Sequence, residues 1–134
     1  MLSMLDLLQR PRRLRQSSSI RGLVRETHVT VRDLIYPIFI QEGISEPVDI
    51  VSMPGIQRVP LSALPALCET LIEAGIPGCA LFPAIESTKK DAMASEAVNP
   101  DNLVCQAVKL IKKTLPEFIV ITDVALDPFS SDGH

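Results

Sequence analysis

Apolar residues gather in three short runs, and two segments with helical spacing separate them. The runs are residues 34–40 (LIYPIFI), 78–83 (GCALFP) and 118–126 (FIVITDVAL). Short apolar runs that alternate with amphipathic helices are typical of βαβ units, in which the strands are parallel. The pattern therefore predicts an α/β fold with three parallel strands.

The first helical segment lies between the first two runs. Its apolar residues recur with the spacing of one buried helix face, at Leu64, Leu67, Cys68, Leu71 and Ile72. Ser62 is expected to cap its start, because a hydroxyl can accept a hydrogen bond from the first turn. Pro65 is tolerated there, and Gly75 is placed to end the helix in a left-handed conformation.

The second helical segment precedes the third run. Asn99 is the expected N-cap, Pro100 the first helical residue and Pro116 the end. Its buried stripe is expected to be Val104, Val108, Ile111 and Leu115.

Two loops are longer than packing requires. Residues 41–60 contain Pro54-Gly55, which suits the centre of a type II turn. Residues 84–98 follow the second strand, at the edge where active sites lie in parallel α/β folds. They are either a wall or lid of a site or a plain solvated loop.

Pro37 inside the first strand predicts an edge position or a bulge, because proline has no N–H.

The third run carries acidic residues at its end. Alternation along a strand puts Ile119, Ile121 and Asp123 on one face, expected to face the core, and extrapolation puts Asp127 on the same side. Burying an acid is costly unless a cation or donor meets it, so such residues are often functional. The stretch DPFSSDG is also good turn chemistry, so a structural Asp that caps nearby backbone remains the alternative.

Composition fits one domain, since 134 residues lie within the roughly 100–200 of a single domain. The content of 46% apolar and 22% charged residues excludes a disordered chain. No stretch approaches the roughly 20 apolar residues that cross a bilayer, so we expect a soluble protein with no membrane partner.

Cys68, Cys79 and Cys105 are odd in number and widely spaced, which favours buried thiols in a reducing cytosol.

Charge is divided along the chain. Residues 1–32 hold seven Arg and two acids, a net +5, whereas residues 33–134 hold six basic and fourteen acidic groups, a net −8. The Arg- and Ser-rich opening is compatible with a transit peptide or with an arm that docks on a partner. No aromatic residue lies among the arginines to stack on bases, so we expect no nucleic-acid partner.

One further enzyme class has carboxylates at a strand end, the magnesium-dependent phosphotransferases. Their aspartates stand two residues apart, but Asp123 and Asp127 are four apart. No Gly-rich phosphate loop follows any predicted strand. This class is therefore a weak alternative.

A series of motifs runs in order from one end of the chain to the other: RPRRLR, LVRET, DLIYPIFI, SMPGIQR, LFPAIESTKKD, SEAVNPDNLV and ITDVALDPFSSDGH. The series resembles the N-terminal part of the porphobilinogen synthase (5-aminolevulinate dehydratase) family. Val98 is one departure, since the family more often has Tyr there. The resemblance implies a TIM (β/α)8 barrel lyase that condenses two 5-aminolevulinate molecules, with loss of water, to porphobilinogen for haem and related tetrapyrroles.

The resemblance also implies site residues. Asp123 matches a catalytic acid that orients the substrate amine or takes part in proton transfer. Asp127 would contact the second substrate's amino group or a water-bound cation, and Ser130 and Ser131 belong to the substrate-binding stretch that leads into a mobile lid. Zinc-dependent members carry cysteines at the positions of Ala125 and Asp127, so this chain resembles the branch that uses Mg²⁺, and zinc is disfavoured.

The implied barrel is partial. A (β/α)8 barrel takes roughly 250 residues, and residues 33–134 supply three strands and two helices. Residues 1–32 would be an extended arm whose Arg12, Arg13 and Arg15 contact a neighbouring subunit of a homo-octamer. We expect a cytoplasmic protein, or a plastid one if the source is a photosynthetic eukaryote.

The family forms Schiff bases on two lysines at strand ends. The lysines here are expected in a loop, at Lys89 and Lys90, or on a helix, at Lys109, Lys112 and Lys113. The chain alone is therefore expected to be inactive. A non-catalytic fragment that binds full-length subunits through its arm is the alternative function.

Overall fold

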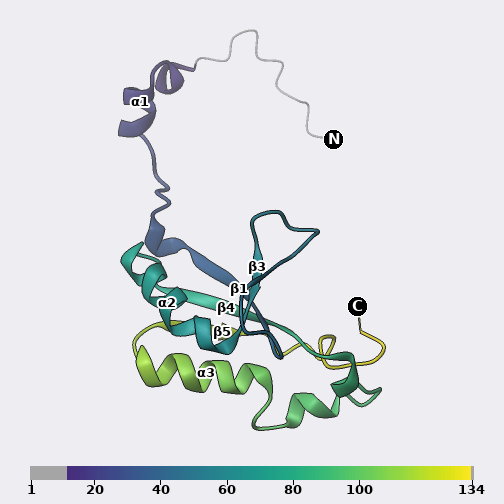
Figure 1. The fold of residues 1–134 in the computed structure, drawn as a ribbon. Coiled ribbons are helices and arrows are strands. Elements are labelled where there is room, and N and C mark those ends of the chain that lie inside the picture. The colour runs from purple at the N-terminus through teal and green to yellow at the C-terminus, as the bar shows by residue number, and fades with distance from the viewer. Residues whose placement is uncertain (1–11, 134) are drawn as a thin grey trace, which may run out of the picture.

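The computed structural model describes residues 12–133 and contains a five-stranded sheet with the order β2-β3-β1-β4-β5 (Figure 1). The strands are β1 (Ile35–Gln41), β2 (Val48–Asp49), β3 (Gln57–Val59), β4 (Gly78–Ala84) and β5 (Ile119–Thr122). The α-helices are α1 (Ser18–Leu23), α2 (Leu64–Glu73) and α3 (Leu103–Thr114). β1, β4 and β5 are parallel, which confirms the α/β prediction and its three strands.

The pair β2 and β3 was not predicted from the sequence. Both lie in the long loop after β1, where β3 pairs parallel with β1 and antiparallel with β2. The expected type II turn joins them: Gly55 has a φ of +82°, and the N–H of Ile56 donates to the carbonyl of Met53 at 3.0 Å. Strands of two and three residues are too short to leave a periodic signal.

Pro37 lies where β1 has a neighbour on one side only. It is paired with Ala80 of β4, whereas β3 pairs with β1 only at Phe39 and Ile40. The edge position expected for a strand proline is therefore confirmed.

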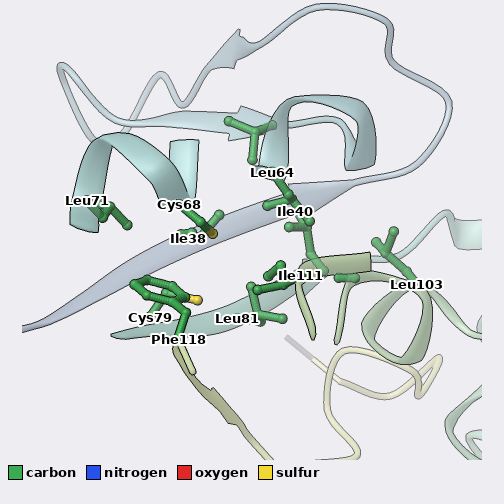
Figure 2. Packing of buried hydrophobic residues seen from close by; sticks show 12 residues of the cluster. Ile38, Ile40, Leu64, Cys68, Leu71, Cys79, Leu81, Leu103, Ile111 and Phe118 are labelled. Carbon is green, nitrogen blue, oxygen red and sulfur yellow. The ribbon is translucent and has the colours of Figure 1, made fainter. Parts of the chain in front are cut away.

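The core lies between the sheet and the helices α2 and α3, which cover the same face (Figure 2). Alternate residues of β1 and β4 point toward the helices, and α2 and α3 return one apolar stripe each. The buried cluster consists of Ile38, Ile40, Val59, Leu64, Cys68, Leu71, Cys79, Leu81, Leu103, Ala107, Ile111 and Phe118.

The opposite face of the sheet is uncovered in the part of the chain that the structure describes. The alternate residues that point to it include Ile35, Phe82, Ile119 and Ile121, all exposed, the last two at 48% and 44%. The row of Ile119 and Ile121 was expected to face the core, and that prediction was wrong. Val120 is the β5 residue that packs against the helices.

The start of α2 differs from the prediction. A short 3-10 turn over Leu61–Ala63 takes in Ser62, so the helix begins at Leu64 without a side-chain cap. Pro65 lies in the first turn as expected. Gly75 ends the helix with a φ of +84°, and its N–H donates to the carbonyl of Ile72 at 2.9 Å, as predicted.

The N-cap of α3 is Asn102, not Asn99. Its Oδ1 accepts from the N–H of Cys105 at 2.9 Å, and its Nδ2 donates to the carbonyls of Glu96 and Ala97. Asn99 instead accepts from the N–H of Asp101 at 3.0 Å and shapes the turn before the helix. Two asparagines three residues apart both have capping chemistry, and only the backbone path distinguishes them.

Replacing Asn102 is expected to destabilise the fold. Asn102→Ala removes the cap of α3 and leaves two carbonyls without their partner around a side chain that is 4% exposed. Urea unfolding should show a loss of about 2 kcal/mol. Asn99→Ala is the matched control and should cost about 0.5 kcal/mol, because Asn99 bonds to the N–H of Asp101 and the carboxylate of Glu96 and caps no helix. Equal losses in the two variants would contradict this assignment of the cap.

Candidate functional site

The carboxyl ends of β1, β4 and β5 meet at one edge of the sheet, and the loops that follow them are joined there. Lys89, in the loop after β4, forms an ion pair with Glu42, which follows β1. The N–H of Ser131, in the segment after β5, donates to the carbonyl of Asp91 at 3.0 Å. The loop of residues 84–98 is thus fastened on both sides and forms a wall of this edge.

Asp91 holds the shape of that wall, and sequence reasoning missed it. Its Oδ1 accepts from the N–H groups of Ser95 and Met93, at 3.0 and 2.9 Å. The bond from Ser95 is the largest of the causes that lower the pKa of Asp91, because backbone donors stabilise the carboxylate. An aspartate that precedes a serine by a few residues in a loop is the signal that could have indicated it.

Asp123 lies just beyond β5 and not within it. The strand ends at Thr122, so the strand expected to reach residue 126 is shorter than predicted. The Oδ1 of Asp123 accepts from the N–H of Ala125 at 3.2 Å. Asp123 thus caps nearby backbone, which was the structural alternative, and the strand alternation stops at Thr122.

Asp123 lines a hollow of about 270 Å³ between the ends of β4 and β5, the start of α3 and the turn after β5 up to Phe129. Most of its wall is apolar, with Phe82, Val104, Leu126 and Phe129 among the lining residues. The polar groups are those of Asn102, Cys105, Thr122 and Asp123. This hollow has one carboxylate in its lining, that of Asp123, whose side chain is exposed.

Asp127 lines a second hollow of about 380 Å³ on the same edge. Its other lining residues are Phe39, Arg58, Pro83, Ala84, Ile85, Lys90 and Pro128. The two hollows share Pro83 and Pro128, so they are neighbours. The structure thus brings Asp123 and Asp127 to one edge but opens them into different hollows.

Ser130 and Ser131 lie in the turn that closes the described chain. The Oγ of Ser130 accepts from the N–H of Asp132 at 3.1 Å, and Ser130 forms an isolated β-bridge with Asp91. The hydroxyl of Ser131 donates to the carboxylate of Asp132 at 3.4 Å. Both serines are therefore engaged within the turn and with the loop after β4.

The cysteines take two different positions. Cys68 and Cys79 are fully buried in the core, as expected, and the hydrogen bond between them raises the pKa of Cys79 so that it stays a thiol. Cys105 is half-buried at the first hollow. Within residues 12–133 no three His, Cys, Asp or Glu side chains gather closely enough to hold a metal ion.

The arm stands apart from the sheet in Figure 1, where α1 is separated from β1 by an extended segment. Arg12, Arg13 and Arg15 are exposed on it. No helix among the described residues is both long and apolar enough to cross a bilayer.

Comparison with known proteins gives a consistent result. A sequence model of the family "Delta-aminolevulinic acid dehydratase" matches residues 8–134. The delta-aminolevulinic acid dehydratase of Bradyrhizobium diazoefficiens is 47% identical over 130 residues, which are 97% of this chain and 37% of that protein. The Escherichia coli enzyme of the same name is 37% identical over 131 residues, 98% of this chain and 40% of that protein.

A solved structure agrees with these matches. The crystal structure of delta-aminolevulinic acid dehydratase (porphobilinogen synthase) from Toxoplasma gondii ME49, in complex with the reaction product porphobilinogen, superposes with a TM-score of 0.86 at 38% identity. The match covers 98% of this chain and 37% of that one, so the chain spans about two fifths of the length of such relatives. The chain belongs to the delta-aminolevulinic acid dehydratase, or porphobilinogen synthase, family.

Proposed function

We propose that this chain supplies the N-terminal part of a porphobilinogen synthase, a lyase that condenses two 5-aminolevulinate molecules with loss of water in haem biosynthesis. The observation that carries the proposal is the superposition of 98% of the chain, at 38% identity, on an enzyme solved with porphobilinogen bound. The relatives from Bradyrhizobium diazoefficiens and Escherichia coli carry the same enzyme name.

The chain contributes the first part of a (β/α)8 barrel. Three parallel strands with α2 and α3 on one face are the arrangement that begins such a barrel. The uncovered face of the sheet then becomes the interior of the barrel, and the edge that carries Asp123 and Asp127 becomes its catalytic mouth. Residues 33–134 are this barrel portion, and residues 1–32 are the arm.

Asp123 serves as an acid that orients the substrate amine or takes part in proton transfer. Its position at a strand end, in a mostly apolar hollow, supports that role. Asp127 contacts the second substrate's amino group or a water-bound cation. Ser130 and Ser131 bind substrate as part of the stretch that leads into the lid.

Magnesium is the proposed metal, and the donor set of the chain fits it only in part. Asp127 offers carboxylate oxygens where thiolates would select zinc, and Mg²⁺ keeps most of its waters and takes one or two carboxylates. Asp127 would therefore hold the ion through water. The ion would supply positive charge, either beside the substrate amine or at a contact between subunits.

The arm is proposed to embrace a neighbouring subunit in a homo-octamer. Its exposed Arg12, Arg13 and Arg15 would meet the acidic surface of a second copy, since residues 33–134 carry a net charge of −8. The cytoplasm is the proposed location.

A chimera tests the proposal. We join these 134 residues to the remaining segment of the Bradyrhizobium diazoefficiens relative, strip the metal with a chelator and add back Mg²⁺ or Zn²⁺. The chimera is expected to form porphobilinogen with Mg²⁺ and to remain near background with Zn²⁺. Asp123→Asn in the chimera should lower kcat by about 100-fold or more, because an amide cannot transfer the proton.

The matched control is Asp101→Asn, which changes an exposed acid in the turn before α3 that lines neither hollow, and it should leave kcat within about twofold. A folded chimera that forms no porphobilinogen with either metal would contradict the proposed function. Full activity of Asp123→Asn would remove only the role given to that residue.

A further inference from the structure

Ala94 has a backbone conformation that costs free energy. Its φ is +51° and its ψ is +41°, and within residues 12–133 it is the one residue other than glycine with a positive φ. In this left-handed region the Cβ of a side chain comes close to the following carbonyl oxygen. Such strain persists only where neighbouring contacts enforce it, and it is found most often at functional sites. The contacts that hold Ala94 are therefore candidates for a functional role.

Asp91 provides three of these contacts. Its Oδ1 accepts from the N–H groups of Met93 and Ser95, on either side of Ala94, at 2.9 and 3.0 Å. Its carbonyl oxygen accepts from the N–H of Ala94 itself at 3.1 Å. Hydrogen bonds to a carboxylate are stronger than those between neutral groups. One residue thus binds three consecutive N–H groups and closes the turn from Asp91 to Ser95.

The same carbonyl oxygen joins this turn to the segment after β5. It accepts from the N–H of Ser131 at 3.0 Å, and Asp91 forms a β-bridge with Ser130. The direction of this carbonyl is set by the turn to which it belongs. If Ala94 left the left-handed region, the carbonyl would rotate and Ser131 would lose its acceptor.

Asp127 belongs to the segment that Asp91 fastens. The two ends of residues 127–133 touch each other, since a Cβ at Gly133 would lie 2.0 Å from the carbonyl oxygen of Asp127. Such a close approach requires glycine and keeps the segment compact. The place of Asp127 at the edge of the sheet therefore depends on the bond between Asp91 and Ser131.

The other end of the loop after β4 is held independently. The Nδ2 of Asn102 donates to the carbonyls of Glu96 and Ala97 at 3.4 and 3.3 Å. Ala97 lines the first hollow, where Asp123 lies. A change at the start of the loop should therefore leave the surroundings of Asp123 in place.

We propose that Asp91 is a positioning residue for the condensation described under the proposed function, on which this step rests. Its carboxylate holds Ala94 in the left-handed conformation, and its carbonyl thereby places the segment that carries Asp127, Ser130 and Ser131. Asp91 acts through this segment and does not itself contact substrate. The strain at Ala94 makes the placement depend on the carboxylate.

Amide hydrogen exchange on the 134-residue chain, followed by NMR, measures the hold on Ser131. Asp91→Ala should lower the protection of the Ser131 amide about tenfold, although the substitution leaves its backbone acceptor in place. Asp91→Asn should keep the protection within about threefold, because the amide oxygen can still accept from the two N–H groups. Asp91 is exposed, so both variants leave the buried cluster unchanged.

Ala94→Gly tests the role of the strain. Glycine adopts the left-handed conformation without steric cost, so adding this substitution to Asp91→Ala should return the protection of Ser131 to within about threefold of the parent chain. Ala97→Gly is the matched control, since Ala97 lies in the same loop without a positive φ, and it should restore nothing. Equal recovery with the two glycine variants, or unchanged protection of Ser131 in Asp91→Ala, would overturn the inference.

The chimera measures the effect on the reaction. Asp91→Ala should raise the KM for 5-aminolevulinate about tenfold and leave kcat within about threefold, because the displaced segment carries groups proposed to bind substrate. Adding Ala94→Gly should restore the KM. A purely structural role would lower the fraction of folded enzyme, which reduces the apparent kcat at an unchanged KM, and that result would contradict a positioning role.

The two experiments separate this inference from the proposed function. A parent chimera without activity defeats the proposed function and, with it, the use of Asp91 in catalysis. The exchange data on the 134-residue chain still decide the hold of Asp91 on Ser131, because they need no turnover.

Discussion

The 134-residue chain on its own is expected to release no porphobilinogen from 5-aminolevulinate and to form no imine that borohydride can trap. A Schiff base needs a neutral amine, which proteins obtain by desolvating a lysine or placing it beside another cation. None of the lysines in this chain stands at the end of β1, β4 or β5. Lys89 and Lys90 lie in the loop after β4.

The surroundings of two of the lysines favour the charged amine. The hydrogen bond and charge of Glu42 raise the pKa of Lys89, and those of Asp101 raise the pKa of Lys109, so both stay protonated at neutral pH. Lys112 donates to the carbonyls of Pro116 and Phe118 at the end of α3. These lysines hold loops and helix ends and are not available as nucleophiles.

Mass spectrometry after borohydride treatment measures this directly, beside a colour assay for porphobilinogen. The full-length relative from Bradyrhizobium diazoefficiens, treated in parallel, should give both the adduct and the product. An adduct on the 134-residue chain would show that a lysine here is nucleophilic. Release of porphobilinogen would contradict the prediction that the Schiff-base lysines lie outside this chain.

The second large effect concerns association. The isolated chain is expected to self-associate through its uncovered sheet face and the free edge of β5, because exposed apolar rows and unpaired strand edges recruit further copies. Ile119→Thr with Ile121→Thr keeps β-branched side chains on the strand and removes apolar area from that face. The dissociation constant between copies should rise by about 100-fold.

Sedimentation velocity across a concentration series measures the shift. Val51→Thr with Val98→Thr is the matched control, since both valines are exposed but lie in a turn and in the 3-10 turn Ser95–Val98, outside the strands of the sheet. The control should associate as the parent chain does. A parent chain that remains monomeric at all concentrations, or an equal shift in both double variants, would contradict this use of the face.

The sequence indicated those parts of the fold that repeat along the chain. The stripe of Leu64, Cys68 and Leu71 and the alternation of Ile38 and Ile40 specify which faces are buried, and Gly75 marks a stop that needs a positive φ. The caps were harder to predict, because the 3-10 turn before α2 and the extra turn before α3 depend on where the chain leaves the sheet.

Only part of the candidate site could be predicted from the sequence. Strand ends predicted the edge at which Asp123 and Asp127 lie, but their separation into two hollows depends on the turn after Thr122, which breaks the alternation. The place of Arg58 at the second hollow could not be predicted, since it results from pairing between strands that are too short to detect. Contacts between distant loops become visible only in three dimensions.

Asn102 limits how the first hollow of this chain can be changed by substitution. One amide both starts α3 and forms part of the wall of the hollow that holds Asp123. A substitution of Asn102 that changed the polarity of that wall would also remove the N-cap of α3. The chemistry of the hollow and the stability of the helix therefore depend on the same side chain. New specificities at this hollow must therefore arise from its other, purely lining positions.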